Sequence, residues 1–270
     1  MKILFLGDIV GQPGIEAVRT LVPKLIAEEA LDLVIANAEN ACSGSGLTPK
    51  QYRQLRTAGV DLITMGDHIY RRAEIIPTLQ SEDRICKPAN FPQTAPGREF
   101  ILAPARNGVL VAAFALLGRT FMRPVDCPFQ AADRVLAQIG AQAKIIFVDM
   151  HAEATSDKYL MGNYLKGRVS AVLGTHTHVP TADEQLMGTT AFISDVGMTG
   201  PYESILGRRV DRVLSHALDF VPAAFDVASG DPRLAGAIVE VEADTGHALA
   251  IRRVMVRLQR DGDCRAGVVN

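Results

Sequence analysis

Two histidines, His176 and His178, stand one residue apart directly after the apolar run 169–173. The run predicts a buried strand, so the pair is placed where a strand ends and a loop begins. In extended backbone, residues two apart project to the same face, and both imidazoles are therefore expected to face one site. Imidazole is a ligand for Zn, Fe, Mn or Ni, so the pair predicts a metal site in preference to two surface histidines.

Further apolar runs end in side chains of the same kind. The runs cover 3–7, 33–36, 62–66 and 145–150, and the residues that end them are Asp8, Glu39 with Asn40, Asp67 with His68, and His151. Each of these residues taken alone has an ordinary structural interpretation, such as a turn or a helix cap for Asp8. Ligands bind outside the carboxyl ends of strands in open α/β sheets, so we expect these side chains to converge on one site.

The size of this set indicates more than one ion. One metal takes four to six ligands, and the sequence offers a larger set: Asp8, Glu39, Asn40, Asp67, His68, His151, His176 and His178. Two metals with Glu39 as a bridge account for it. Two ions about 3.5–4 Å apart stabilise both oxygens of a phosphoryl transfer and lower the pKa of a bound water. Three carboxylates leave two divalent ions with net positive charge, which favours an anionic phosphate ester.

The elements that position these residues alternate between strand and helix. Strands are predicted over 2–7, 32–37, 61–65, 108–118, 144–148, 169–174 and 190–194, and helices over 14–29, 48–59, 72–80, 128–139 and 156–166. The stretch 86–107 and the glycine-rich stretch 195–201 are predicted to be loops, the second lining the same cleft. A hairpin is expected over 236–258. The pattern predicts a layered α/β fold in one domain over residues 1–270.

Composition limits the partners. The net charge of the 270 residues is −2 and no basic stripe is present, so long nucleic acid is not expected as a ligand. No apolar run approaches the roughly 20 residues of a membrane span, and the first residues are too short an apolar segment for a signal peptide. The cysteines, Cys42, Cys86, Cys127 and Cys264, show no C-x-x-C spacing and predict reduced thiols in a cytoplasmic protein.

The motifs, in their order along the chain, resemble those of the calcineurin-like metallophosphoesterases, and most closely the bacterial YmdB-like branch. They are Gly7-Asp8, Glu39-Asn40, Gly66-Asp67-His68, His151 and Gly174-Thr175-His176-Thr177-His178. The stretches around Asp8 and Glu39 and the stretch 195–200 favour that branch. The resemblance runs from residue 1 to beyond residue 200. It implies a four-layer αββα sandwich of mixed sheets with a dinuclear metal centre.

The resemblance also implies phosphodiesterase activity on small phosphodiesters, namely 2′,3′-cyclic or 3′,5′-cyclic nucleotides, by metal-hydroxide attack. Carried over by position, one metal is held by Asp8, Glu39 and His178, and the other by Glu39, Asp67, His151 and His176. His68 is implied as the general acid, which protonates the leaving oxygen without binding metal.

Two departures from the broad family bear on the metals. The family's D-x-H motif is here Asp8-Ile9-Val10, so one histidine is missing and Asn40 is expected to fill its place. The usual G-N-H is here Gly66-Asp67-His68. Aspartate adds a charge and a hard oxygen ligand, which favours Fe or Mn, with Zn or Mg as alternatives.

Other functions remain open at this point. An amidohydrolase also carries H-x-H, but usually early in its chain, on the first barrel strand. A regulatory protein that senses a metal or nucleotide with little turnover would have the same ligands, although His68 favours catalysis. A nuclease acting on RNA ends is disfavoured because a basic groove is missing. The apolar helices and the C-terminal hairpin are compatible with a homo-oligomer.

Overall fold

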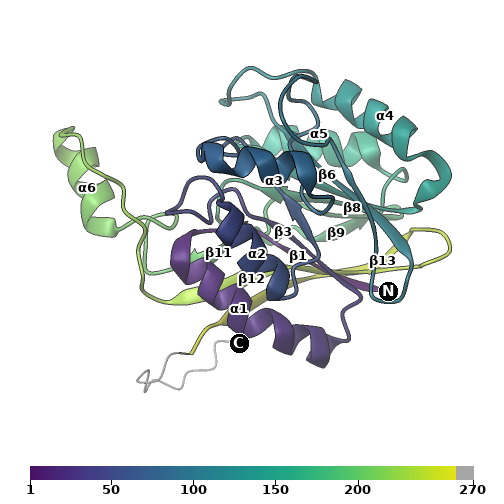
Figure 1. Cartoon of the computed structure of the whole chain (residues 1–270), viewed down its shortest axis with the longest axis horizontal. Coiled ribbons are helices and arrows are strands. Elements are labelled where there is room, and N and C mark those ends of the chain that lie inside the picture. The colour runs from purple at the N-terminus through teal and green to yellow at the C-terminus, as the bar shows by residue number, and fades with distance from the viewer. Residues whose placement is uncertain (260–270) are drawn as a thin grey trace.

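The computed structural model describes residues 1–259, which form two β-sheets packed face to face with helices on both outer faces (Figure 1). The first sheet has the order β2-β11-β12-β1-β3-β4, with β13 paired to β12. Its strands are β1 (Lys2–Leu6), β2 (Asp8–Ile9), β3 (Leu33–Asn37), β4 (Leu62–Thr64), β11 (Met198–Pro201), β12 (Pro232–Val241) and β13 (Ala248–Arg257).

The second sheet has the order β5-β6-β7-β8-β10-β9. Its strands are β5 (Ile101–Pro104), β6 (Leu110–Leu117), β7 (Ile145–His151), β8 (Ala171–Thr175), β9 (Gln185–Met187) and β10 (Thr190–Ile193). Both sheets are mixed: β7 pairs in parallel with β6 and β8, whereas β5 and β9 are antiparallel edges.

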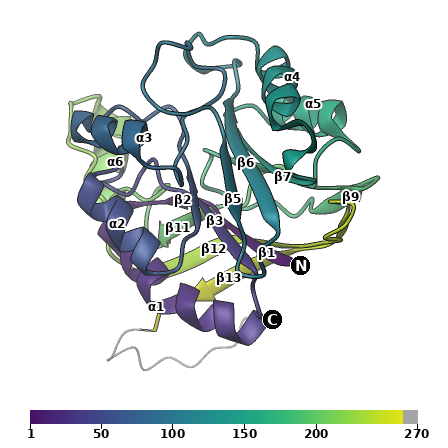
Figure 2. The same ribbon diagram turned by 45° about the vertical axis from the view of Figure 1, so that its right-hand side comes forward.

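The helices form the two outer layers, as the turned view shows (Figure 2). The helices α1 (Gly11–Glu29), α2 (Pro49–Thr57) and α3 (Ile76–Ser81) cover the first sheet, and α4 (Pro128–Ile139) and α5 (Thr155–Leu165) cover the second. Short 3-10 turns, Ala73–Ile75 and Gly140–Gln142, precede α3 and follow α4. The four-layer arrangement expected from the resemblance is confirmed.

The strands are apolar on both faces because each face is covered. In β1, Ile3 and Phe5 point into the core between the sheets, and Leu4 and Leu6 into the core under the first helices. In β7, Ile145 and Phe147 enter the same central core, while Ile146 and Val148 pack under α4 and α5. Alternate residues thus serve different layers, as the two-residue period of a strand requires.

Local signals fix several helix ends. Thr48 accepts a hydrogen bond from the backbone N–H of Gln51, whose side chain returns to Thr48, and this capping box starts α2. Gly59 follows α2 with φ +101°, as expected of a residue after a helix end. Pro128 opens α4, whose bounds match the predicted helix 128–139. The C-terminal hairpin is also present, as β12 and β13.

Two sequence predictions about loops are wrong. The stretch 86–107 contains the edge strand β5, and the glycine-rich stretch 195–201 contains β11. The strand β11 pairs with β2 on one side and with β12 on the other, so tertiary pairing overrides the weak strand propensity of Gly and Pro. The edge strand β9 was not predicted either, because its three residues carry no alternation long enough to recognise.

One helix, α6 (Val210–Asp219), lies away from the layers (Figure 1) and has no buried residue. Within residues 1–259, none of the helices combines the length and apolarity that crossing a membrane requires. Cys42, Cys86 and Cys127 are free cysteines, and Cys264 lies outside the described residues.

The central core predicts a large effect for one substitution. Phe5→Ala removes a fully buried ring from between the sheets, so the free energy of unfolding is expected to fall by about 3–5 kcal/mol. Urea unfolding measures this. Leu249→Ala, at a position on β13 that is 57% exposed, is the control and is expected to stay within about 0.5 kcal/mol of the parent. Equal losses in both variants would contradict this account of the core.

Candidate metal centre

The candidate site lies where the carboxyl ends of strands from both sheets meet. The parallel strands β1, β3 and β4 of the first sheet lead to Asp8, Glu39 and Asp67. The parallel strands β7 and β8 of the second sheet end at or just before His151 and His176. The first sheet therefore supplies carboxylates and the second supplies imidazoles.

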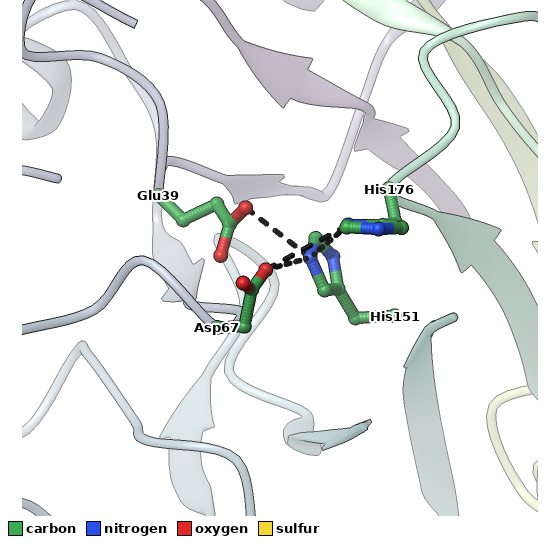
Figure 3. Close-up of side chains that lie close together, drawn as sticks. All are labelled: Glu39, Asp67, His151 and His176. Atoms are coloured by element: carbon green, nitrogen blue, oxygen red, sulfur yellow. Dashed lines mark hydrogen bonds and ion pairs between the residues drawn. The ribbon is translucent and has the colours of Figure 1, made fainter. Parts of the chain in front are cut away.

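Four of these side chains form a compact cluster (Figure 3). One donor atom from each of Glu39, Asp67, His151 and His176 lies within 4.8 Å of the others. The Nε2 atom of His151 is at the centre, 3.2 Å from Glu39 Oε1, 3.4 Å from Asp67 Oδ1 and 3.0 Å from His176 Nδ1. Glu39 and His151 are fully buried, and the other two are partly exposed.

Asp8, Asn40 and His178 form a second group beside this cluster. His178 Nε2 lies 3.8 Å from Asp8 Oδ1 and 3.2 Å from the amide nitrogen of Asn40. The same amide nitrogen donates to Glu39 Oε1 at 3.3 Å, so Glu39 stands between the two groups. Ligation of a metal by the Asn40 oxygen would require the amide to rotate by half a turn.

Each group contains one carboxylate oxygen whose surroundings fit a cation. Among the described residues, Asp8 Oδ1 and Asp67 Oδ1 are buried and have no hydrogen bond of good geometry; their ionic neighbours are histidine nitrogens at 3.4–3.9 Å. A buried polar atom left unsatisfied costs about 1–3 kcal/mol, and more when charged. A divalent cation coordinated by these oxygens and the neighbouring imidazoles removes that cost, and carboxylate with imidazole is a donor set that such metals take. The residues present therefore fit metal binding in both groups.

Residues that are not candidate ligands orient His151. The hydroxyl of Thr175 donates to Asp149 Oδ1 at 2.6 Å and lies 2.8 Å from His151 Nδ1. His151 therefore donates its Nδ1–H to Thr175, and its Nε2 faces Glu39 and Asp67. Sequence reasoning missed Asp149 and Thr175, although a carboxylate two residues before His151 in an apolar strand is a usable signal.

Asp149 is buried among hydrogen-bond donors. Besides Thr175, the hydroxyl of Thr64 and the amide of Asn37 donate to its carboxylate, at 2.6 Å and 2.9 Å. Burial raises the pKa of Asp149 to about 6, and His151 and the two hydroxyls limit that rise.

Each of the other two histidines, His176 and His178, is also oriented by a contact that one of its ring nitrogens makes. His176 Nε2 lies 3.3 Å from Glu153 Oε2, which leaves Nδ1 toward the cluster. His178 Nδ1 donates to the carbonyl of Leu206 at 3.0 Å, which leaves Nε2 toward Asp8. Neither Glu153 nor Leu206 carries a sequence signal, since both contacts depend on how loops fold over the strand ends.

Burial and mutual charge set the protonation of the metal-free site. Burial opposes a charge on His151, but Glu39, Asp67 and Asp8 raise its pKa well above the usual value. Burial would raise the pKa values of Asp8 and Asp67, but the histidines beside them hold both below the usual range. Burial and the neighbouring His151 lower the pKa of His176. The metal-free site therefore carries a proton on His151 among ionised carboxylates.

His68 lies at the rim of the site. Its backbone N–H donates to Glu39 Oε2 at 2.9 Å, and its Nδ1 lies 2.7 Å from Asn40 Oδ1. The side chain is 25% exposed, and its Nε2 is 3.8 Å from Asp67 Oδ2. His68 is not a member of the four-residue cluster.

The backbone near the ligands departs from the sequence prediction. His176 and His178 both have positive φ, at +95° and +67°, so the prediction that they lie in extended backbone is wrong. The strand β8 ends at Thr175, and the two histidines turn toward different groups of the site. A two-residue period applies only where the strand continues.

Nearly the whole chain is similar to known proteins. The model of the family described as YmdB-like protein matches residues 4–254. A 2′,3′-cyclic-nucleotide 2′-phosphodiesterase of Bacillus subtilis is 43% identical over 257 residues, which cover 95% of this chain and 97% of that protein.

Two crystal structures are similar over the same extent. One, of a hypothetical protein from Thermus thermophilus, has a TM-score of 0.89 at 41% identity and covers 95% of this chain and 99% of its own. The other, of a novel phosphatase from Mycoplasma pneumoniae, has a TM-score of 0.89 at 28% identity. This similarity covers 95% of this chain and 93% of the phosphatase chain.

Protonation of His151 predicts how metal binding depends on pH. The stabilisation from His151 in the metal-free protein is fully present below its unfolded pKa of about 6.5 and is lost as pH rises through the raised folded value. Metal binding displaces that proton, so affinity rises with pH. The increase in Tm caused by metal is therefore expected to be larger at about pH 8 than at about pH 6.

Thermal unfolding with and without Mn²⁺ measures this effect. The variant His247→Gln, which removes an exposed histidine near the hairpin turn, is the control and should keep the parent's pH dependence. A metal-induced rise in Tm that does not change with pH would contradict proton displacement at His151.

Gly66 predicts a second effect on metal binding. A Cβ atom at Gly66 would lie 2.1 Å from Glu39 Oε2 and 2.4 Å from His151 Nε2, so Gly66→Ala must displace ligand side chains. We expect metal affinity to fall by about tenfold or more. Gly108→Ala is the control: its φ of +86° makes the substitution destabilising, but its Cβ would meet nothing within 4 Å, so it lowers stability without displacing a ligand. Competition with a chelator measures both variants, and equal affinities would refute the close packing at Gly66.

Proposed function

Because this chain belongs to the YmdB-like protein family, we propose that it is a metal-dependent phosphodiesterase that hydrolyses 2′,3′-cyclic nucleotides. The observation that carries the metal dependence is the pair of buried, unsatisfied oxygens, Asp8 Oδ1 and Asp67 Oδ1, each beside imidazole nitrogens. The substrate class is supported by the name of the Bacillus subtilis relative.

The proposed centre holds two metal ions. Glu39, Asp67, His151 and His176 would hold one, and Asp8, Glu39 and His178 would hold the other, with Asn40 as a further donor if its amide rotates. Carboxylate and imidazole ligands favour Fe or Mn, with Zn and Mg as the alternatives. When bound, such ions supply a water of lowered pKa and positive charge next to the phosphate.

His68 is the proposed general acid. With the Asn40 amide oriented as in the structure, its oxygen accepts the Nδ1–H of His68. If the amide rotates to bind metal, its NH2 group faces Nδ1 instead, and in both orientations Nε2 is the ring atom left to transfer a proton outward. Glu39 Oε1 lies 3.3 Å from the same Nδ1. Water loses one proton to solvent and adds to phosphorus as hydroxide, and the bond from phosphorus to the ribose 2′ oxygen breaks. That oxygen takes the proton from His68 Nε2, and solvent returns a proton to His68 before the next turnover.

The direct test is hydrolysis of 2′,3′-cyclic AMP by Mn²⁺-loaded protein. Turnover that stops with a chelator and yields the 3′-monophosphate supports the proposal, and 3′,5′-cyclic AMP tested in parallel defines the substrate range. A protein with bound metal and no turnover would overturn the proposal and favour a sensing role.

A variant separates the role of His68 from that of the ligands. His68→Ala is expected to keep its metals and lose about 10²–10⁴-fold in kcat on cyclic nucleotides, because the leaving oxygen is no longer protonated. Bis(p-nitrophenyl) phosphate, whose leaving group needs no proton, should lose much less. Elemental analysis and steady-state kinetics measure both effects. Asp67→Asn is the control expected to lose metal, and equal metal loss in His68→Ala would identify His68 as a ligand instead.

A further inference from the structure

The segment that carries His176 and His178 is held in an unfavourable backbone conformation. Both histidines have positive φ, which for residues other than glycine costs of order 1–3 kcal/mol each unless the surroundings enforce it. This conformation sends His176 Nδ1 toward Asp67, at 3.7 Å, and His178 Nε2 toward Asp8, at 3.8 Å. The surroundings must therefore fix the residue between the two histidines.

That residue, Thr177, is bound by Asp195. The backbone N–H and the hydroxyl of Thr177 both donate to Asp195 Oδ2, at 3.2 Å and 2.7 Å. The other oxygen of Asp195 accepts the N–H of Gly197 at 2.8 Å. Thr181, at the far end of the loop, donates its N–H to the Asp195 carbonyl and accepts the Asp195 N–H. The loop is thus tied to Asp195 at its middle and at its end.

The charge of Asp195 is balanced by Lys158. Lys158 projects from α5, and its Nζ donates to Asp195 Oδ2 at 2.7 Å. The two residues are 2% and 1% exposed. The stem of Lys158 passes against Gly174, where a Cβ would lie 2.9 Å from Lys158 Cδ and 1.7 Å from the carbonyl oxygen of Ser194. The glycine before the histidine motif is therefore needed for the pair to reach the loop.

A buried ion pair is a weak source of stability, because desolvation of two charges offsets most of their attraction. Neither Lys158 nor Asp195 is among the candidate ligands, and the side-chain hydrogen bonds of the pair join the two residues to each other, to Thr177 and to Gly197. The pair places a charged hydrogen-bond acceptor, the Asp195 carboxylate, next to the backbone N–H of Thr177. Thr177 is the residue between the two histidines that have positive φ.

We propose that the Lys158–Asp195 pair positions the metal centre: through Thr177 it holds segment 176–178 so that His176 serves one group of ligands and His178 the other. Both are positioning residues, since they act only through the loop. The inference rests on the proposed metal centre. Loss of the pair should therefore weaken metal binding by about 10–100-fold, the range for partners that orient metal ligands.

The contacts among Lys158, Asp195 and Thr177 are called the anchor here. The test compares three variants of the anchor with one control variant. The double variant Lys158→Met, Asp195→Asn removes both charges together, so that neither is left buried alone. Thr177→Val removes only the hydrogen bond of the hydroxyl, and Thr177→Ser, which keeps a hydroxyl at the same position, retains that hydrogen bond. Lys87→Met is the matched control, because Lys87 is equally buried but its Nζ donates to the carbonyls of Pro92, Gln93 and Ala95.

The readouts are Mn²⁺ affinity by competition with a chelator, amide hydrogen exchange over 176–178 in metal-free protein, and Tm. We expect weaker affinity and faster exchange in the double variant, smaller effects in Thr177→Val and parent-like values in Thr177→Ser. Lys87→Met should lower Tm and leave affinity and exchange at 176–178 unchanged.

The outcomes separate this inference from the function proposed above. Parent protein that binds no metal overturns that function and this inference together. Parent protein that binds metal, with anchor variants that bind it equally well and exchange equally slowly, overturns this inference alone. The inference is also overturned if Mn²⁺ affinity and Tm fall in the same proportion in Lys87→Met as in the anchor variants. General destabilisation would then explain the loss of affinity.

Discussion

The structure depends on the burial of several carboxylates in one small volume. Asp8, Glu39 and Asp149 have almost no exposed surface, and a donor atom of Asp67 lies within 4.8 Å of one of Glu39. An unpaired charge of this kind costs several kcal/mol, so the chain must place cations and hydrogen-bond donors around them. Among the candidate ligands at the strand ends, the first sheet supplies Asp8, Glu39 and Asp67 and the second supplies His151 and His176, so the face-to-face packing of the sheets brings these acids and imidazoles together. The apolar core between the sheets, with Phe5 and Phe147, therefore determines the geometry of the polar site.

The motif glycines have packing roles in this arrangement. A side chain at Gly66 would occupy the space of Glu39 and His151, and one at Gly174 would collide with Ser194 and Lys158. Neither glycine has a positive φ, so close approach and not backbone freedom requires it. Gly66 thus leaves room for Glu39 and His151 at the site, and Gly174 leaves room for Lys158 and the Ser194 carbonyl beneath the histidine loop.

The identity of the candidate ligands was predictable because each follows an apolar run, and the ends of parallel strands are where such residues gather. Asp8, Glu39, Asp67, His151 and His176 were found in this way, and the structure brings them together. The residues that orient them were not found. Thr175, Glu153 and Lys158 act across elements or sheets, and no local pattern encodes such a pairing. The direction of His176 and His178 was also missed, because it depends on a turn enforced by Asp195.

The orienting contacts explain how a site of this kind is ready for metal. Each of His151, His176 and His178 has one ring nitrogen engaged by a residue outside the ligand set, namely Thr175, Glu153 and the carbonyl of Leu206. The remaining nitrogen of each ring already faces the carboxylates. Metal binding then exchanges a proton for a cation with little movement of the three histidine side chains, so few of their rotamers remain to be ordered in that step. The ligand side chains are therefore ordered during folding, before metal binds. The contacts that order them also stabilise the ends of the two sheets and so offset the entropy cost.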